Sequence, residues 1–204
     1  MSKEIRAFNF EVRAEQNEEH GSHLTGRPIV FNSRTNLGWY DEIIEENALA
    51  ETDLRDVRFL VNHNTDMIPL ARSRNNTENS TMQMVVVREG MDIRVDLDTE
   101  NNAEAKSLYS AVSRGDISGM SFMFTVDEDS WDDLESEHPT RTIRKIGKVF
   151  EVSAVTFPAY ESTSIQARGL SDALDSARAS LDSVLAERRE VERKKQKIRI
   201  LAEV

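Results

Sequence analysis

Apolar and polar residues alternate in several short segments of the chain, which is the pattern of half-buried β-strands. The clearest of these segments are Phe8–Val12, Val57–His63, Met82–Val87, Met91–Leu97, Met120–Val126 and Val149–Thr156. Arg88, Glu89 and Gly90 separate two of the segments and predict a hairpin turn. The chain therefore has at least five predicted strands before residue 160.

Helical spacing of apolar residues interrupts this series of strands. Leu108 and Val112 lie on one predicted helical face, and Gly115 is a suitable C-terminal stop. The segment Asp41–Arg55 also has helix-like composition, with acidic residues in its first turn. We therefore expect two helices within the strand-rich region.

The last segment, Gly169–Val204, predicts one long helix. Arg188 and Lys195 interrupt its apolar stripe at core-type positions, so the stripe weakens toward the C-terminus. The stripe suits either a helix docked on its own domain or weak self-association. Its apolar residues follow a 4-3 spacing: Leu170, Leu174, Ala177, Leu181, Val184, Val191 and Ile198.

Together these elements predict an α+β fold. We expect a mostly antiparallel, β-barrel-like core with surrounding helices over residues 1–168. A helical tail over residues 169–204 should follow it, and we expect this tail to be separable from the domain.

Composition limits the kinds of chemistry and the compartment. The 204 residues contain no cysteine, which excludes a thiol nucleophile, a disulfide framework and a thiolate zinc site. No apolar run is long enough to cross a membrane, and the N-terminus lacks an apolar signal core. We expect a protein of a cytoplasm-like compartment with no membrane contact.

The net charge of −11 is spread unevenly along the chain. Residues 169–204 carry 8 basic and 7 acidic side chains, whereas the preceding residues carry 18 basic and 30 acidic ones. A body this acidic repels nucleic acid, so we expect no nucleic-acid partner.

Two groups of polar residues suggest metal ions but do not have suitable spacing. His20 and His23 lie in a polar stretch, residues 16–25, that predicts a solvated loop. The segment Asp127–Glu137 holds seven acidic residues but lacks the glycine and terminal glutamate of an EF-hand loop. We expect this segment to be a solvated loop as well, and we expect neither a metal nor another cofactor.

Three residues near predicted strands supply the chemistry of a serine hydrolase, which needs a nucleophile, a base and an orienting acid. They are His63, Ser121 and Glu151, in that order along the chain. Alternation with Met120 and Phe122 turns Ser121 away from the large apolar face of its strand. The serine has no second glycine of a Gly-x-Ser-x-Gly elbow, which disfavours an α/β-hydrolase.

The sequences around these three residues resemble the prohead protease family of tailed bacteriophages, whose fold is similar to that of herpesvirus assemblin. The resemblance runs from about Gly26 to Arg168. Ala71 and Met123 stand where the family usually or often has glycine. The matching stretches are Gly26–Asn32, Leu60–His63, Ile68–Arg72, Gly119–Phe124 and Glu151–Ala159.

The resemblance implies roles for particular residues. Ser121 would be the nucleophile, His63 the general base and Glu151 the acid that orients the base. Ser153 and His138 compete with Glu151 for the third role, since the herpesvirus relatives use a second histidine there. For the oxyanion we consider the backbone N–H groups beside Ser121, such as that of Phe122, and the side chain of Arg72.

The resemblance also implies substrates and a place of action. The substrates would be the scaffold, or the scaffold-like N-terminal segment of the major capsid protein, and the protease itself. Cleavage would occur inside the procapsid, in the host cytoplasm. The alternative is a catalytically inactive scaffolding or assembly protein that keeps a protease-derived fold and acts through its C-terminal helix.

Overall fold

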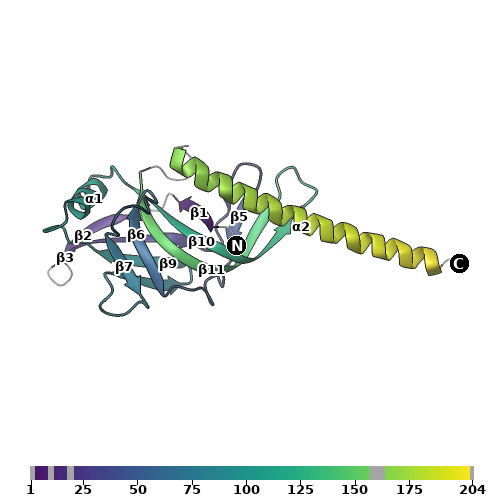
Figure 1. Cartoon of the computed structure of the whole chain (residues 1–204), viewed down its shortest axis with the longest axis horizontal. Coiled ribbons are helices and arrows are strands. Elements are labelled where there is room, and N and C mark those ends of the chain that lie inside the picture. The colour runs from purple at the N-terminus through teal and green to yellow at the C-terminus, as the bar shows by residue number, and fades with distance from the viewer. Residues whose placement is uncertain (1–2, 9–11, 18–20, 157–163, 203–204) are drawn as a thin grey trace.

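The computed structural model describes residues 3–8, 12–17, 21–156 and 164–202. It contains two β-sheets and two helices, α1 (Ala103–Ser113) and α2 (Ser164–Ala202) (Figure 1). The strands are β1 (Lys3–Phe8), β2 (Arg13–Asn17), β3 (Gly21–Val30), β4 (Thr35–Asn36), β5 (Asp41–Ile44), β6 (Asp56–Val61), β7 (Ala71–Arg74), β8 (Met82–Val87), β9 (Gly90–Asp96), β10 (Gly119–Asp132) and β11 (Thr140–Val155).

The long hairpin of β10 and β11 organises the larger sheet, whose strand order is β1-β10-β11-β5-β4. One end of β11, from Thr140, pairs in parallel with β5. Its other end, from Glu151 to Ala154, pairs in parallel with β6, which in turn pairs with β7. The residues that follow β6 are thereby brought next to the last residues of β11.

The smaller sheet has the order β2-β3-β9-β8 and shares one hydrophobic core with the larger sheet. Phe122 and Phe124 of β10 enter this core with ring centroids 4.6 Å apart. Leu24 of β3 and Met82 of β8 come to it from the other sheet and are completely buried. Burial of these side chains from both sheets is the main apolar contribution to stability.

The α+β class and the mostly antiparallel pairing agree with the sequence prediction. Seven of the nine strand pairs in the described part of the chain are antiparallel, and the two pairs of β11 with β5 and β6 are parallel. The strand pairs of the described residues form two open sheets and no closed barrel. The barrel-like core is therefore not confirmed.

The prediction of a helix over Asp41–Arg55 is wrong. Residues 41–44 form β5, and residues 46–51 form turns before β6 begins at Asp56. Glu42 of β5 is buried and forms an ion pair with Arg6. Tertiary pairing has overridden the helical composition, because β5 gains a neighbour on each side.

Both segments predicted as solvated loops contain strands. Within residues 16–25, β2 and β3 form an antiparallel pair, and His23 is buried, with Nδ1 3.2 Å from the Gly21 carbonyl oxygen. His20 lies outside the described residues. Asp127 to Asp132 belongs to β10, and only the turn that follows lacks strand structure. Strands β10 and β11 continue to pair in this acidic segment. Its acidic composition did not indicate a strand.

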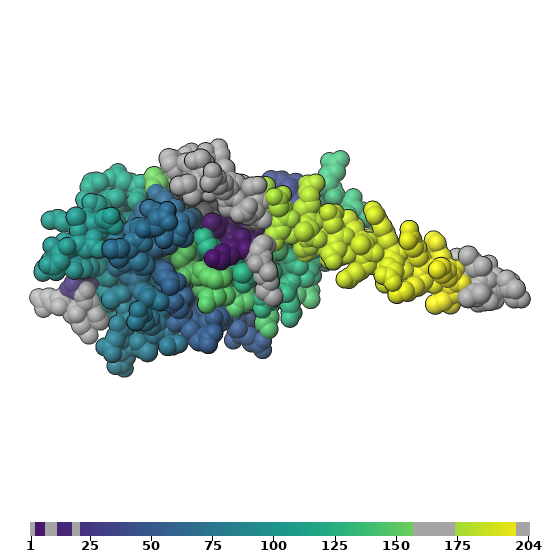
Figure 2. All heavy atoms as spheres, viewed as in Figure 1, coloured from purple at the N-terminus to yellow at the C-terminus, as the bar shows by residue number. Residues whose placement is uncertain are grey.

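Helix α2 packs against the β-structure for part of its length. Ala177 is completely buried beside Tyr40 and Trp131, and Leu181 and Val184 are partly buried in the same cluster. The side chains of residues 185–198 lie on the surface, apart from the partly buried Leu185. This half of the helix projects beyond the sheets (Figures 1 and 2). No helix among the described residues is long and apolar enough to cross a membrane.

A buried ionic network connects β1, β5, β11 and α2. Arg6 donates to both Glu42 and Glu4. Arg141 donates to Glu4 at 2.9 Å and to Glu42 at 3.3 Å. Ser176 of α2 donates to Glu4 Oε1 at 2.8 Å, and the same oxygen accepts a second hydrogen bond from Arg141 at 3.1 Å. Since the four charged side chains are at most 3% exposed, each depends on the others for compensation.

Candidate active site

His63 lies on a turn immediately after β6. The strand ends at Val61, and Asn62 and His63 follow with φ angles of 51° and 56°. This left-handed conformation is unfavourable for residues with a Cβ, although asparagine tolerates it comparatively well. The alternation predicts that His63 shares the inward face of Val57 and Phe59. The turn takes His63 away from that face.

Four hydrogen bonds hold this turn against the end of β11. The Asn62 N–H donates to the Ala154 carbonyl at 2.9 Å. The Asn62 side chain donates to Thr156 Oγ1 at 3.0 Å and accepts the Thr156 N–H at 2.9 Å. The His63 N–H donates to Ser153 Oγ at 3.1 Å. The sequence from Glu151 to Thr156 thus determines the shape of the turn that carries the histidine.

His63 and Glu151 form a buried pair. Their atoms Nδ1 and Oε1 are 2.5 Å apart, and their side chains are only 2% and 3% exposed. The other carboxylate oxygen accepts a hydrogen bond from Ser153 Oγ at 2.5 Å. Among the described residues, none bonds His63 Nε2. A ring that donates from Nδ1 to the carboxylate leaves Nε2 as a proton acceptor.

Ser121 lies on β10 directly opposite Ser153 of β11. Side chains of directly opposite residues share a face, with Cβ atoms roughly 5 Å apart. Ser121 is completely buried, and its hydroxyl donates to the Arg6 carbonyl oxygen at 2.7 Å. The nucleophile candidate is thus one strand away from the residues that surround Glu151, on the face opposite to Phe122.

A cleft of about 1030 Å³ borders His63. It lies between the turn after β6 and helix α1, with apolar lining from Met67 and Leu108. The exposed carboxylates of Asp66 and Glu104 also line it. The volume reaches the upper end of small-molecule sites, about 300–1,000 Å³, and is sufficient for a peptide segment.

Arg72 is engaged away from the proposed nucleophile. Its guanidinium group donates to both oxygens of Asp56, at 2.6 and 2.8 Å, and these hydrogen bonds lower the pKa of Asp56. Arg72 lies on β7, three strands from β10 across β6 and β11. Three strand spacings amount to roughly 14 Å between backbones.

His138 is engaged elsewhere too. Its Nε2 is 2.8 Å from Asp41 Oδ1, and this hydrogen bond lowers the pKa of Asp41. His138 precedes β11, whereas Glu151 lies near the end of that strand. The intervening strand has a contour length of roughly 35 Å. Of the three candidates for the third role, Glu151 is the one bonded to the His63 ring.

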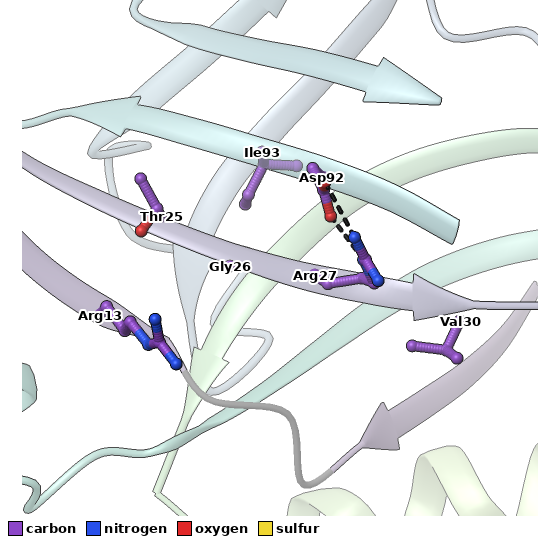
Figure 3. Close-up of a pocket in the computed structure, with 7 residues that line it drawn as sticks. All are labelled: Arg13, Thr25, Gly26, Arg27, Val30, Asp92 and Ile93. Atoms are coloured by element: carbon purple, nitrogen blue, oxygen red, sulfur yellow. Dashed lines mark hydrogen bonds and ion pairs between the residues drawn. The ribbon is translucent and has the colours of Figure 1, made fainter. Parts of the chain in front are cut away.

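A second hollow, of about 540 Å³, lies on the smaller sheet (Figure 3). Arg13 of β2 and Arg27 of β3 line it, and Arg27 pairs with Asp92 at 2.5 Å. None of the candidate catalytic residues lines this hollow. No three potential metal ligands of the histidine, aspartate and glutamate types come together in the described part of the chain.

Sequence reasoning missed the hydrogen-bonding functions of Asn62, Ser153 and Thr156. Asparagine before a histidine at a strand end is a signal for left-handed backbone. The alternation of Glu151 and Ser153 along β11 also indicated that both side chains share a face. Neither signal identifies the partner atoms, because these belong to a strand about ninety residues away.

The buried histidine–glutamate pair and the serine one strand away supply the three residue types that a serine hydrolase uses. Comparison with known proteins specifies the family. The model of the caudovirus prohead serine proteases matches residues 8–176, and the chain belongs to this family.

Two known proteins are similar to the chain. The prohead protease of enterobacteria phage HK97 is 30% identical over 157 residues, which are 75% of this chain and 63% of that protein. The chain thus spans less than two thirds of the length of this relative. The structure of the bacteriophage T4 capsid assembly protease is 14% identical, with a TM-score of 0.37, and the match covers 74% of this chain and 98% of that one.

Proposed function

We propose that this chain is a serine endopeptidase of procapsid maturation. Its substrates are the scaffold or the N-terminal segment of the major capsid protein, and the protease itself, inside the procapsid in the host cytoplasm. The observation that carries the proposal is the buried His63–Glu151 pair, because the His63 Nε2 atom has no partner among the described residues and the histidine borders a cleft of peptide size. Membership of the prohead protease family supports the choice of substrate.

In the first step, Ser121 Oγ attacks the carbonyl carbon of the scissile peptide bond. Its proton passes to His63 Nε2, and the carbonyl π electrons move to the oxygen. The Ser121 hydroxyl, which donates to Arg6 in the structure, must first rotate about χ1 toward the histidine. Serine has three staggered rotamers, so this rotation requires no change in the backbone.

In the second step, the carbon–nitrogen bond breaks and His63 gives its proton to the leaving amine. Water then repeats the sequence on the acyl-enzyme and releases the second product. Glu151 holds the ring through Nδ1 and stabilises the imidazolium ion that forms in each half-reaction. The short, buried contact between the two side chains suits this function.

For the oxyanion we retain the backbone N–H of Phe122, which adjoins the nucleophile. This group belongs to β10, which has a strand on each side, so the substrate must compete with strand pairing for it. We omit Arg72 from the proposed oxyanion site, because Asp56 binds its guanidinium group and its strand is remote from β10.

The alternative of an inactive assembly protein has one observation in its favour. The hydroxyl of Ser121 is completely buried and donates to a main-chain carbonyl instead of to histidine. The two functions differ in whether they require Ser121. An assembly protein keeps its function when the hydroxyl is removed, and a protease does not.

Co-expression of the chain with the capsid protein of its own phage tests the proposal. We expect the capsid protein to be shortened by the wild-type chain and to remain intact with Ser121→Ala or His63→Ala. Ser73→Ala is a matched control, since Ser73 is a completely buried strand serine whose hydroxyl has no partner among the described residues. Shortening at the wild-type rate by Ser121→Ala, in a chain shown by circular dichroism to be folded, would defeat the proposal.

A further inference from the structure

We infer that Ser153 is a positioning residue of the site, which fixes both the main chain of His63 and the carboxylate of Glu151. This inference rests on the proposed function, because it assigns Ser153 a task within the His63–Glu151 pair. No other described side-chain hydroxyl bonds both members of the pair.

The hydroxyl of Ser153 makes two hydrogen bonds of opposite sense. It donates to Glu151 Oε2 at 2.5 Å and accepts the His63 N–H at 3.1 Å. A serine hydroxyl has one proton to donate and two lone pairs to accept with, so it can form both bonds simultaneously. Ser153 is completely buried, and water does not compete for either bond.

The first bond determines how the Glu151 carboxylate is oriented. One oxygen of the carboxylate faces His63 Nδ1 and the other faces Ser153 Oγ. With both oxygens bonded, rotation of the carboxylate about its terminal torsion is blocked. This torsion is otherwise broad and weakly restricted. Oε1 is thereby kept in line with the ring.

The second bond fixes the position of the His63 main chain, from which the side chain extends. His63 has a left-handed backbone with φ of 56°, a conformation that persists only when its surroundings impose it. The bond from its N–H to Ser153 anchors the main chain, and the bond from Nδ1 to Glu151 anchors the ring. Ser153 acts at both ends of the same residue and so sets the direction of Nε2.

The geometry also argues against two other roles for Ser153, that of the nucleophile and the third catalytic role that the sequence had left open. A nucleophilic role for Ser153 would break both of the hydrogen bonds that hold the His63–Glu151 pair. Ser121 would give up only its bond to a main-chain carbonyl. A hydroxyl does not carry the charge that stabilises an imidazolium ion, and Glu151 occupies the position beside Nδ1. The residue therefore acts through its neighbours.

Replacement by alanine would leave two buried groups without partners, the His63 N–H and Glu151 Oε2. We expect Ser153→Ala to lower kcat for capsid-protein cleavage by roughly 10- to 100-fold while KM stays within about 2-fold, because Ser153 touches no substrate. Ser153→Thr keeps the hydroxyl and should restore most of the activity. Ser73→Ala, a buried serine of β7 outside the site, should match the wild type.

Proton NMR of the unliganded protein gives a readout that does not depend on substrate. The hydrogen-bonded Nδ1 proton of His63, assigned by its absence in His63→Gln, should shift or broaden in Ser153→Ala and remain in place in Ser153→Thr and Ser73→Ala. This readout applies even if the added methyl group of the threonine variant prevents folding.

Unchanged kcat together with an unchanged Nδ1 resonance in Ser153→Ala would overturn the inference. Failure of the proposed function looks different, because the wild type would then leave the capsid protein intact, or Ser121→Ala would cleave it as well as the wild type does. If Ser121→Ala and His63→Ala are inactive while Ser153→Ala matches the wild type, the proposed function stands and the positioning role falls.

Discussion

Asn62 and His63 adopt left-handed backbone conformations at the point where β6 ends. Strand alternation alone would have directed His63 into the core with Val57 and Phe59. The turn releases the histidine from that face and brings it to Glu151, which lies on β11 among residues paired with β6. Because His63 lies on this turn beside the sheet, its side chain is buried and still borders the cleft.

The sequence identified His63, Ser121 and Glu151 as candidates, because the residue types and their flanking segments resemble a known family. Their geometry was accessible only in part. Alternation correctly predicted that Phe122 enters the hydrophobic core, and Ser121, on the other face of the strand, is completely buried as well. The bonds of Ser153 and Asn62 were not predictable, because they depend on strand register and a left-handed turn.

Glu151→Gln tests how the acid contributes. The amide removes the charge that stabilises the imidazolium ion and also disturbs the choice of ring tautomer. We expect kcat to fall by roughly 10²- to 10⁴-fold and to stay above that of Ser121→Ala, because an orienting acid contributes less than the nucleophile. Cleavage of the capsid protein under single-turnover conditions measures the difference. Wild-type kcat in the glutamine variant would show that the pair does not serve catalysis.

At the scale of elements, β11 joins the parts of the larger sheet. Its first half pairs with β5 beside the ionic network, and its second half pairs with β6 beside the proposed site. The alternation of apolar and polar residues correctly predicted a strand in the second half of β11, where Val152 and Ala154 lie in the hydrophobic core. It failed around Glu42 and Arg141, because these charged residues occupy buried positions that a hydrophobic pattern assigns to solvent.

The ionic network predicts how stability depends on pH. Burial by itself raises the pKa of Glu4, but the Arg6 and Arg141 guanidinium groups outweigh it, so the pKa lies below its ordinary value of 4.5. A carboxylate whose pKa is lowered by folding stabilises the folded state above its unfolded pKa. It loses that contribution as the pH falls through its folded pKa.

We therefore expect Glu4→Gln to lower the free energy of unfolding by about 3 kcal/mol at neutral pH. The difference from the wild type should shrink below about pH 4, as the wild-type carboxylate becomes protonated. Urea unfolding followed at several pH values measures both quantities. Glu100→Gln, an exposed carboxylate, is the control and should change little. A difference that does not vary with pH would contradict this account.

Helix α1 forms one wall of the cleft beside His63, which predicts that filling the cleft blocks substrate. Ser107 is exposed on α1 and lines the cleft, whereas its neighbour Lys106 is exposed and does not. We expect Ser107→Trp to reduce kcat/KM for the capsid protein by roughly 10-fold or more, equivalent to about 1.4 kcal/mol or more. Lys106→Trp should change it little, and neither should alter thermal stability much. Equal effects of the two substitutions would place the substrate elsewhere.

At the scale of the whole molecule, the sequence predicted a strand-rich domain followed by a helical tail, and the structure has a strand-rich part followed by the long helix α2. The boundary at residue 168 came from the start of the 4-3 apolar spacing and from the extent of the family resemblance. The contacts favour a later division, because Ala177 is buried beside Trp131 and Ser180 accepts the Trp131 Nε1–H at 3.0 Å. We propose that the domain includes α2 up to Val184 and that the separable tail begins at Leu185.

The proposed tail differs from the domain in charge. The described residues 185–198 carry six basic and three acidic side chains, whereas the chain as a whole has a net charge of −11. Val191 and Ile198 are 49% and 68% exposed and lie seven residues apart, on one face of the helix. A stripe this short is marginal as an isolated coiled coil, so a partner helix would have to supply the rest of the interface.

We therefore predict that the tail recruits the protease to the procapsid, through scaffold helices or weak self-association, and that it is not needed for folding. A chain ending at Val184 should keep the wild-type melting temperature and still cleave the capsid protein in a purified mixture, but should be absent from isolated procapsids. A chain ending at Arg168 should be less stable, since it exposes Tyr40 and Trp131 and removes the Ser176 bond to Glu4.

The double substitution Val191→Ser and Ile198→Ser provides the matched test in the full-length chain, because it removes the apolar stripe and keeps the helix and its charges. We expect it to reduce incorporation without affecting cleavage in the purified mixture. If the chain ending at Val184 enters procapsids as well as the wild type does, recruitment belongs to the domain. The projecting half of α2 then has another function.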